Sequence, residues 1–153
     1  MSEPREVRAI PVRGIPEIDR HSKISKELVS ACARQDTPLE AGDILIVTHK
    51  IISKAEGQVV RLDGVKPSRR SRGWARRYPV DARVIELALR QARRVVRMRN
   101  GVLITETKQG LVCANSGVDL SNVDGGDSAV LLPKDPDRSA ARSAQARKRQ
   151  RQP

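Results

Sequence analysis

The chain contains no Phe, one Trp and one Tyr, so its core has to be built from aliphatic side chains. Val, Ile, Leu and Ala supply most of the 38% hydrophobic fraction, and an aliphatic core of this kind suits buried strands. At 153 residues the chain is long enough for one domain with a real core and too short for two of ordinary size. We therefore expect a single domain rich in aliphatic strands.

The net charge of +12 favours anionic partners such as nucleic acid, nucleotides or acidic metabolites. Much of the excess lies in two arginine-rich runs, one at 68–77 and one in the last twenty residues. Proteins that bind nucleic acid commonly place aromatic side chains among the basic ones for base stacking, and this chain has almost none. The composition disfavours nucleic acid as a partner without excluding it.

Cys32 and Cys113 are far apart and lack CxxC spacing, so the sequence indicates neither a zinc site nor a disulfide framework. The N-terminus has no apolar segment typical of a signal peptide, and no apolar run approaches 18 residues. We expect a cytoplasmic protein with no membrane partner.

Helical spacing of apolar residues predicts a helix over 22–35 and another over 81–94, and Trp74 is expected to anchor a third, short one. The continuous apolar run over 44–54 is the strongest strand signal. Further strands are expected at 6–12, 58–62, 95–98, 102–108, 111–115 and 129–133. Because helices and strands do not alternate regularly, the order predicts an α+β fold, or mixed-sheet α/β, with an aliphatic sheet and two or three helices.

The composition changes sharply after Pro133, where Ala is the only apolar residue left. A short helix is conceivable there, but nothing in the sequence would anchor it. We therefore expect a domain over 1–137 and a basic, disordered tail over 138–153.

The stretch "VCANSGVDLSNVDGGD" at 112–127 buries almost nothing but is rich in hard oxygen donors. Mg²⁺ and Mn²⁺ prefer such donors in proteins. The alternative is a polar loop shaped by Asx-turns, and the spacing excludes an EF-hand. The donors are Asn115, Asp119, Asn122, Asp124 and Asp127.

Lys50 and Lys54 lie in "THKIISKAEG" at 48–57, beside the expected strand. Lysines in the loops of a sheet protein can hold phosphate groups as point charges. Solvated lysines at a strand end are an equally good interpretation of this motif alone. His21 and His49 are too few and too distant to form a ligand pair.

Taken in order, four segments resemble the coenzyme F420-0:L-glutamate ligase family. They are "GIPEI" at 14–18, "GDILIVTHKIISKAEGQVV" at 42–60, "VLITETKQGLVCANSGVDLSNV" at 102–123 and "LLPKDPDRSA" at 131–140. The resemblance runs from about residue 7 to residue 141, and the motif at 115–123 is its most specific part.

The resemblance implies a ligase that uses GTP and Mg²⁺ or Mn²⁺, with K⁺ as a further candidate ion, to join L-glutamate to coenzyme F420-0 through an acyl phosphate. It also implies a homodimer. Asp119 falls on the family's metal-binding aspartate, and His49 and Lys50 fall on a nucleotide-contacting pair whose side chains look different here. The positions matching the family's other GTP contacts are Ile15, Pro16, Glu17, Ile18, Lys54 and Asn122.

Family members continue past "LLPKDPDRSA" into a second half that supplies further metal and nucleotide contacts. The chain is therefore expected to be truncated relative to the family, and to be inactive or incomplete as a ligase. The competing classes are a nucleotide-binding remnant without catalysis and a basic RNA-binding protein, and a steep loss of affinity with salt would distinguish the latter.

Overall fold

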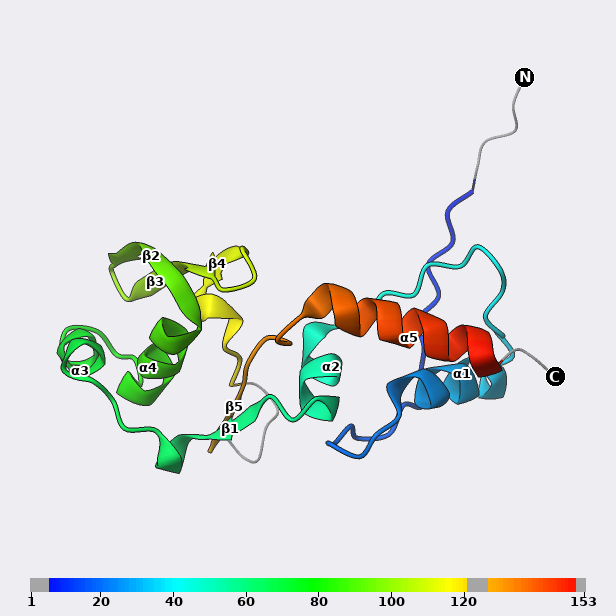
Figure 1. Ribbon diagram of the computed structural model, residues 1–153, viewed down its shortest axis with the longest axis horizontal. Helices are drawn as coiled ribbons and strands as arrows, with labels where there is room; N and C mark the ends of the chain where they lie inside the picture. The colour runs from blue at the N-terminus through cyan, green and yellow to red at the C-terminus, as the bar shows by residue number, and fades with distance from the viewer. Residues whose placement is uncertain (1–5, 121–126, 151–153) are drawn as a thin grey trace, which may run out of the picture.

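The computed structural model of the protein describes residues 6–120 and 127–150, with side chains up to residue 145. Its helices are α1 (Ile24–Arg34), α2 (His49–Ala55), α3 (Arg69–Ala75), α4 (Ala82–Gln91) and α5 (Pro136–Gln150). Its strands are β1 (Val59–Arg61), β2 (Ala92–Arg99), β3 (Val102–Thr107), β4 (Val112–Ala114) and β5 (Ser128–Val130). Figure 1 shows α1, α2 and α5 at one end of the molecule, α3, α4 and β2–β4 at the other, and β1 and β5 between them.

All strand pairs among the described residues are antiparallel, and they form two small sheets. β1 pairs with β5 so that Val59 lies opposite Val130, and β2, β3 and β4 form a meander in which Thr105 lies opposite Cys113. The α+β class is therefore confirmed. The described residues hold five helices rather than two or three, and two small sheets rather than one mixed sheet.

The strand predicted over 44–54 is wrong. Residues 43–48 are extended but pair with no strand in the described chain, and the rest of the run forms α2. The strand predicted over 6–12 also fails, because that segment is extended without a ladder partner among the described residues. A strand is stable only when a neighbour takes up its backbone hydrogen bonds, and periodicity cannot report whether that neighbour exists.

The helix predicted over 81–94 ends earlier, at Gln91, and its last residues begin β2. Arg93 and Arg94 each form an ion pair with Glu106 of β3, at 3.3 Å and 2.6 Å. These arginines therefore lie beside β3 instead of extending the helix.

Where the sequence predicts a disordered tail from 138, the structure has α5, which packs against α1. The Ser139 hydroxyl donates to the Glu56 carboxylate at 2.6 Å, and the Ser25 hydroxyl donates to the Ser143 carbonyl at 3.3 Å. Arg142 also pairs with Glu56. Small polar side chains thus anchor a helix that has Ala as its only apolar residue.

The core is aliphatic, as expected, with Trp74 as its largest member. One cluster joins β1, β5 and α4 and contains Leu62, Val65, Val84, Leu87, Ala129 and Leu131. The other joins α3, α4 and β3 and contains Trp74, Ile85, Ala88 and Leu103. Across residues 6–120 and 127–150, no helix is both long and apolar enough to cross a lipid bilayer.

Candidate nucleotide site

Lys50 and Lys54 lie one turn apart on α2 and therefore share a face of that helix. The Lys50 Nζ lies 2.9 Å from the Asp119 Oδ2, and the Lys54 ammonium pairs with the Glu17 carboxylate. Lys54 is mostly buried, with 14% of its side chain exposed, whereas Glu17 is 83% exposed. Two distant segments thus meet the same face of α2.

The turn that carries Glu17 is anchored by an apolar neighbour. Ile18 is buried, at 6% exposure, and Ile15 is half-buried, whereas Pro16 is exposed. The turn opens with Gly14 at φ +69°, a left-handed conformation that suits glycine. Burial of Ile18 holds the backbone so that the Glu17 carboxylate reaches α2.

The polar stretch that ends at Asp119 has a structural role in its first part. Asn115, Ser116 and Gly117 take successive left-handed conformations, with φ of +50°, +53° and +70°. The buried Ser116 hydroxyl donates to the Ala88 carbonyl at 2.6 Å and bonds the Thr105 hydroxyl at 2.7 Å. This turn joins α4 and β3 and directs the chain toward β5.

Asp119 is positioned by its backbone. Its N–H donates to the Val130 carbonyl at 2.9 Å, and its carbonyl accepts from the Val130 N–H at 2.8 Å. The paired backbone holds the Asp119 carboxylate beside Lys50, with 29% of the side chain exposed. Asn122 and Asp124, two further oxygen donors of the polar stretch at 112–127, lie outside the described residues.

The described donors do not by themselves fit a resident divalent ion. No group of three His, Cys, Asp or Glu side chains gathers around one point in the described chain. Asp119 is engaged by an ammonium group instead, and Mg²⁺ keeps its waters unless several ligands converge on it. His49 does not join the lysine face but lines a neighbouring pocket.

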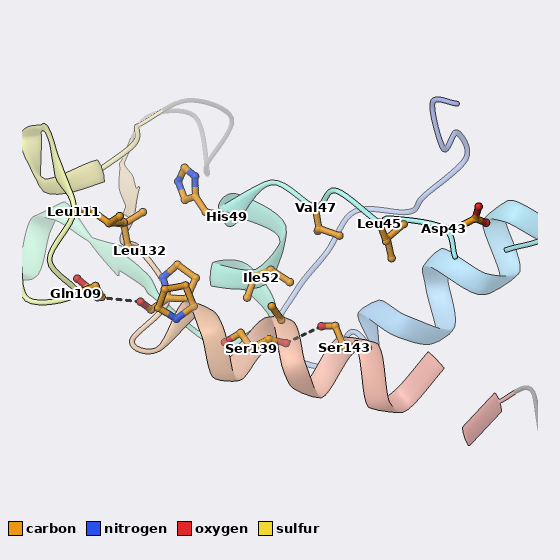
Figure 2. Close-up of a pocket in the computed structure, with 14 residues that line it drawn as sticks. Asp43, Leu45, Val47, His49, Ile52, Gln109, Leu111, Leu132, Ser139 and Ser143 are labelled. Atoms are coloured by element: carbon orange, nitrogen blue, oxygen red, sulfur yellow. Dashed lines mark hydrogen bonds between the residues drawn. The ribbon is translucent and has the colours of Figure 1, made fainter. Parts of the chain in front are cut away.

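That pocket, of about 480 Å³, lies between α2, α5 and the extended segment before α2 (Figure 2). Its walls are mostly aliphatic, with Leu45, Val47 and Ile52 on one side and Leu111 and Leu132 on another. No pattern in the sequence predicted this pocket. The sequence feature that could have predicted the pocket is the continuous apolar run just before α2, which supplies Leu45 and Val47 to its wall.

Residues 14–150 match the sequence model of a family described as F420-0:Gamma-glutamyl ligase. A protein of Methanopyrus kandleri named coenzyme F420:L-glutamate ligase is 45% identical over 106 residues, which are 69% of this chain and 42% of that protein. Its namesake in Methanothermobacter thermautotrophicus is 37% identical over 134 residues, 88% of this chain and 53% of the relative. The one in Archaeoglobus fulgidus is 38% identical over 134 residues, 88% of this chain and 51% of the relative. The chain spans about half the length of these relatives.

Proposed function

Because the chain belongs to the F420-0:gamma-glutamyl ligase family, we propose that it supplies the nucleotide-binding half of a GTP-dependent ligase. The ligase adds L-glutamate to coenzyme F420-0 by forming an amide bond. The single observation that carries the proposal is the meeting of two separate segments on one face of α2, where Lys50 and Lys54 contact Asp119 and Glu17.

The proposed reaction has two steps. The γ-phosphoryl group of GTP passes to a carboxylate oxygen of coenzyme F420-0, and GDP leaves. The amino nitrogen of L-glutamate then attacks the carbonyl carbon of the acyl phosphate, phosphate departs with the C–O bond, and the nitrogen loses a proton. In such reactions nearly all of the acceleration comes from positioning and charge stabilisation.

In this scheme Lys50 and Lys54 exchange their carboxylate partners for phosphate oxygens of GTP. Both ammonium groups lie on one helix face, so both can contact the same phosphate chain. The turn with Ile15, Pro16 and Glu17 forms the side of the proposed GTP site next to Lys54. Asn122 and His49 are further GTP contacts that the family resemblance implies.

The proposed ion, Mg²⁺ or Mn²⁺ with K⁺ as a further candidate, binds only together with GTP. When bound, a divalent ion neutralises charge on the phosphates. Asp119 is the proposed protein ligand, and phosphate oxygens complete the coordination that the described side chains lack. A homodimer and cytoplasmic location remain expectations from the resemblance and the composition.

The test is GTP binding by calorimetry in the presence and absence of Mn²⁺. We expect Lys50→Ala and Lys54→Ala each to weaken binding about tenfold or more, because each removes a charge that contacts phosphate. Lys66→Ala is the matched control, because Lys66 is exposed and its backbone lies beside Arg90 of α4 rather than on the lysine face of α2. Asp119→Asn should weaken only the metal-dependent part of binding. Equal GTP affinity in all four variants would contradict the proposal.

A second candidate function, binding of RNA, is favoured by the distribution of charge. Residues 61–114 carry fourteen Lys and Arg but four Asp and Glu, a difference of +10 out of the chain's +12. All four carboxylates already pair with arginines. Among the described residues, the exposed arginines of this region that form no ion pair are Arg69, Arg70, Arg72, Arg76, Arg77, Arg97 and Arg99.

Salt dependence separates the two functions. An RNA complex should lose affinity steeply as salt rises, because counterions are released, and Arg97→Gln with Arg99→Gln should reduce that slope. Fluorescence anisotropy of a labelled RNA measures it. If RNA binds weakly and GTP binding does not change in the Arg97→Gln, Arg99→Gln variant, the results favour the ligase function over RNA binding.

A further inference from the structure

Residues 43–48 are built like a strand of a sheet interior but lie unpaired. Leu45 and Val47 line the pocket beside α5, whereas Ile44 and Ile46 are 88% and 92% exposed. Strands that are apolar on both faces are typical of sheets covered on both sides. Within the described chain no strand pairs with this segment.

Apart from Asp43 and His49, the pocket wall offers little to a polar ligand, because the hydroxyl and amide groups in it are already engaged. The Gln109 amide donates to the Pro133 carbonyl at 3.0 Å, and the Ser143 hydroxyl donates to the Ser139 carbonyl at 3.0 Å (Figure 2). The Ser139 hydroxyl bonds Glu56. Small-molecule sites depend on a few polar groups that converge on the ligand, and here the hydroxyl and amide groups bond to the protein instead.

An aliphatic β-strand would fit both features of this surface, the backbone of 44–48 and the aliphatic pocket beside it. Its backbone can pair with residues 44–48, whose N–H and C=O groups lack a ladder partner in the described chain, and its apolar side chains can enter the pocket. The polypeptide that carries this strand could also cover the exposed side chains of Ile44 and Ile46. Exposed apolar edges are otherwise sites of unwanted association, so a folded protein normally covers them.

We propose that residues 43–48 are the docking edge for a strand from the other half of the ligase, the half that the family has and this chain does not span. The relatives are about twice as long as the segment that matches them, so in those proteins a similar length of chain is available to pack against the matched half. Val7, in another segment without a ladder partner among the described residues, is likewise 93% exposed. The inference rests on the proposed function only through family membership, and not through GTP or ligation.

The experiment is co-expression of this chain with the unmatched part of the Methanothermobacter thermautotrophicus relative, purified through a tag on the latter without GTP or metal. We expect a complex of the two polypeptides in equal amounts, and protection of the amides of 44–48 from hydrogen exchange by at least tenfold. The double variant Ile44→Lys, Ile46→Lys should abolish co-purification. Val96→Lys with Val102→Lys, two exposed apolar positions on the β2–β3 hairpin, should leave it intact.

Three results would overturn the inference: failure of the unmodified pair to co-purify, a complex that tolerates lysine at 44 and 46, or amides of 44–48 that stay fast in the complex. A stable dimer of this chain, protected at 44–48 and not displaced by the other polypeptide, would assign the edge to a second copy instead. Because GTP is absent throughout, failure here leaves the calorimetric test of Lys50 and Lys54 unaffected.

Discussion

At the scale of single residues, the turn at 115–117 shows why a polar stretch occurs where the chain could have placed core residues. Ser116 is fully buried and links Ala88 of α4 to Thr105 of β3. The left-handed backbone there lets Gly117 pass close to Leu132, so that a Cβ on Gly117 would lie 2.7–2.8 Å from three Leu132 side-chain atoms. The turn fixes where the chain enters the Asp119 segment.

Gly117→Ala should therefore destabilise the fold by about 1–3 kcal/mol, through backbone strain at φ +70° and the clash with Leu132. Gly110→Ala is the matched control, because Gly110 has φ +86° but open space around the added Cβ. Urea denaturation measures both. Gly110→Ala should lower the free energy of unfolding by less than Gly117→Ala does. Equal decreases would show that the contact with Leu132 contributes nothing.

Glu86 is the most strongly perturbed carboxyl among the described residues. Hydrogen bonds from Ser68, and then from Arg90 and Ser71, lower the pKa of Glu86 from 4.5 to about 2 despite its burial. The folded pKa lies below the unfolded one, so this stabilisation is fully present above pH 4.5 and is lost as the pH falls from 4.5 toward 2. The size of the shift corresponds to about 3 kcal/mol at most.

Glu86→Gln should lower the free energy of unfolding at pH 7 and flatten its dependence on pH between 4.5 and 2. Glu106→Gln is the control, because its ion pairs with Arg93 and Arg94 involve largely exposed arginines and contribute little. Denaturation at a series of pH values measures both variants. An unchanged pH profile in Glu86→Gln would contradict the assignment.

At the scale of elements, α5 illustrates how a helix without an apolar stripe can still be ordered. Glu56, at the C-terminal end of α2, bonds both Ser139 and Arg142 of α5, and Ser25 of α1 bonds the backbone of α5. These contacts place α5 as one wall of the pocket beside Leu45 and Val47 (Figure 2). The C-terminal helix therefore belongs to the folded unit.

Glu56→Ala should release α5, because it removes the partner of Ser139 and Arg142 together. We expect faster amide hydrogen exchange over residues 139–145, with little change in α4 at the other end of the molecule. Glu40→Ala, at an exposed glutamate of the loop before α2, is the control. Unchanged exchange in α5 would show that packing against α1 suffices to hold it.

At the scale of the whole molecule, the chain spans about half the length of its relatives, and its candidate site has two acidic groups, Asp119 and Glu17, beside two lysines. A phosphoryl-transfer site needs several ligands and contacts placed together, and losing some of them commonly costs orders of magnitude in rate. Under the docking proposal, the exposed Ile44 and Ile46 of residues 43–48 lie where the other half of the ligase would pack.

We expect no ligation by this chain alone. The purified chain would be incubated with GTP, Mn²⁺, L-glutamate and coenzyme F420-0, and mass spectrometry would detect a glutamylated product. Product should form only when the other half of the ligase is supplied. Robust product from this polypeptide by itself would refute the need for that half.

The sequence by itself determined the aliphatic core, the helices α1 and α4, the meander of β2–β4 and the family, because each depends on local periodicity or on a motif within one segment. Tertiary structure decided the rest. The run at 44–54 divides into an unpaired segment and α2 because the described residues offer no neighbouring strand, and α5 forms because Glu56 and α1 anchor it. Lys50 meets Asp119 only because the Ser116 turn and the bridge to Val130 bring together residues 69 positions apart, a long-range contact that no local pattern encodes.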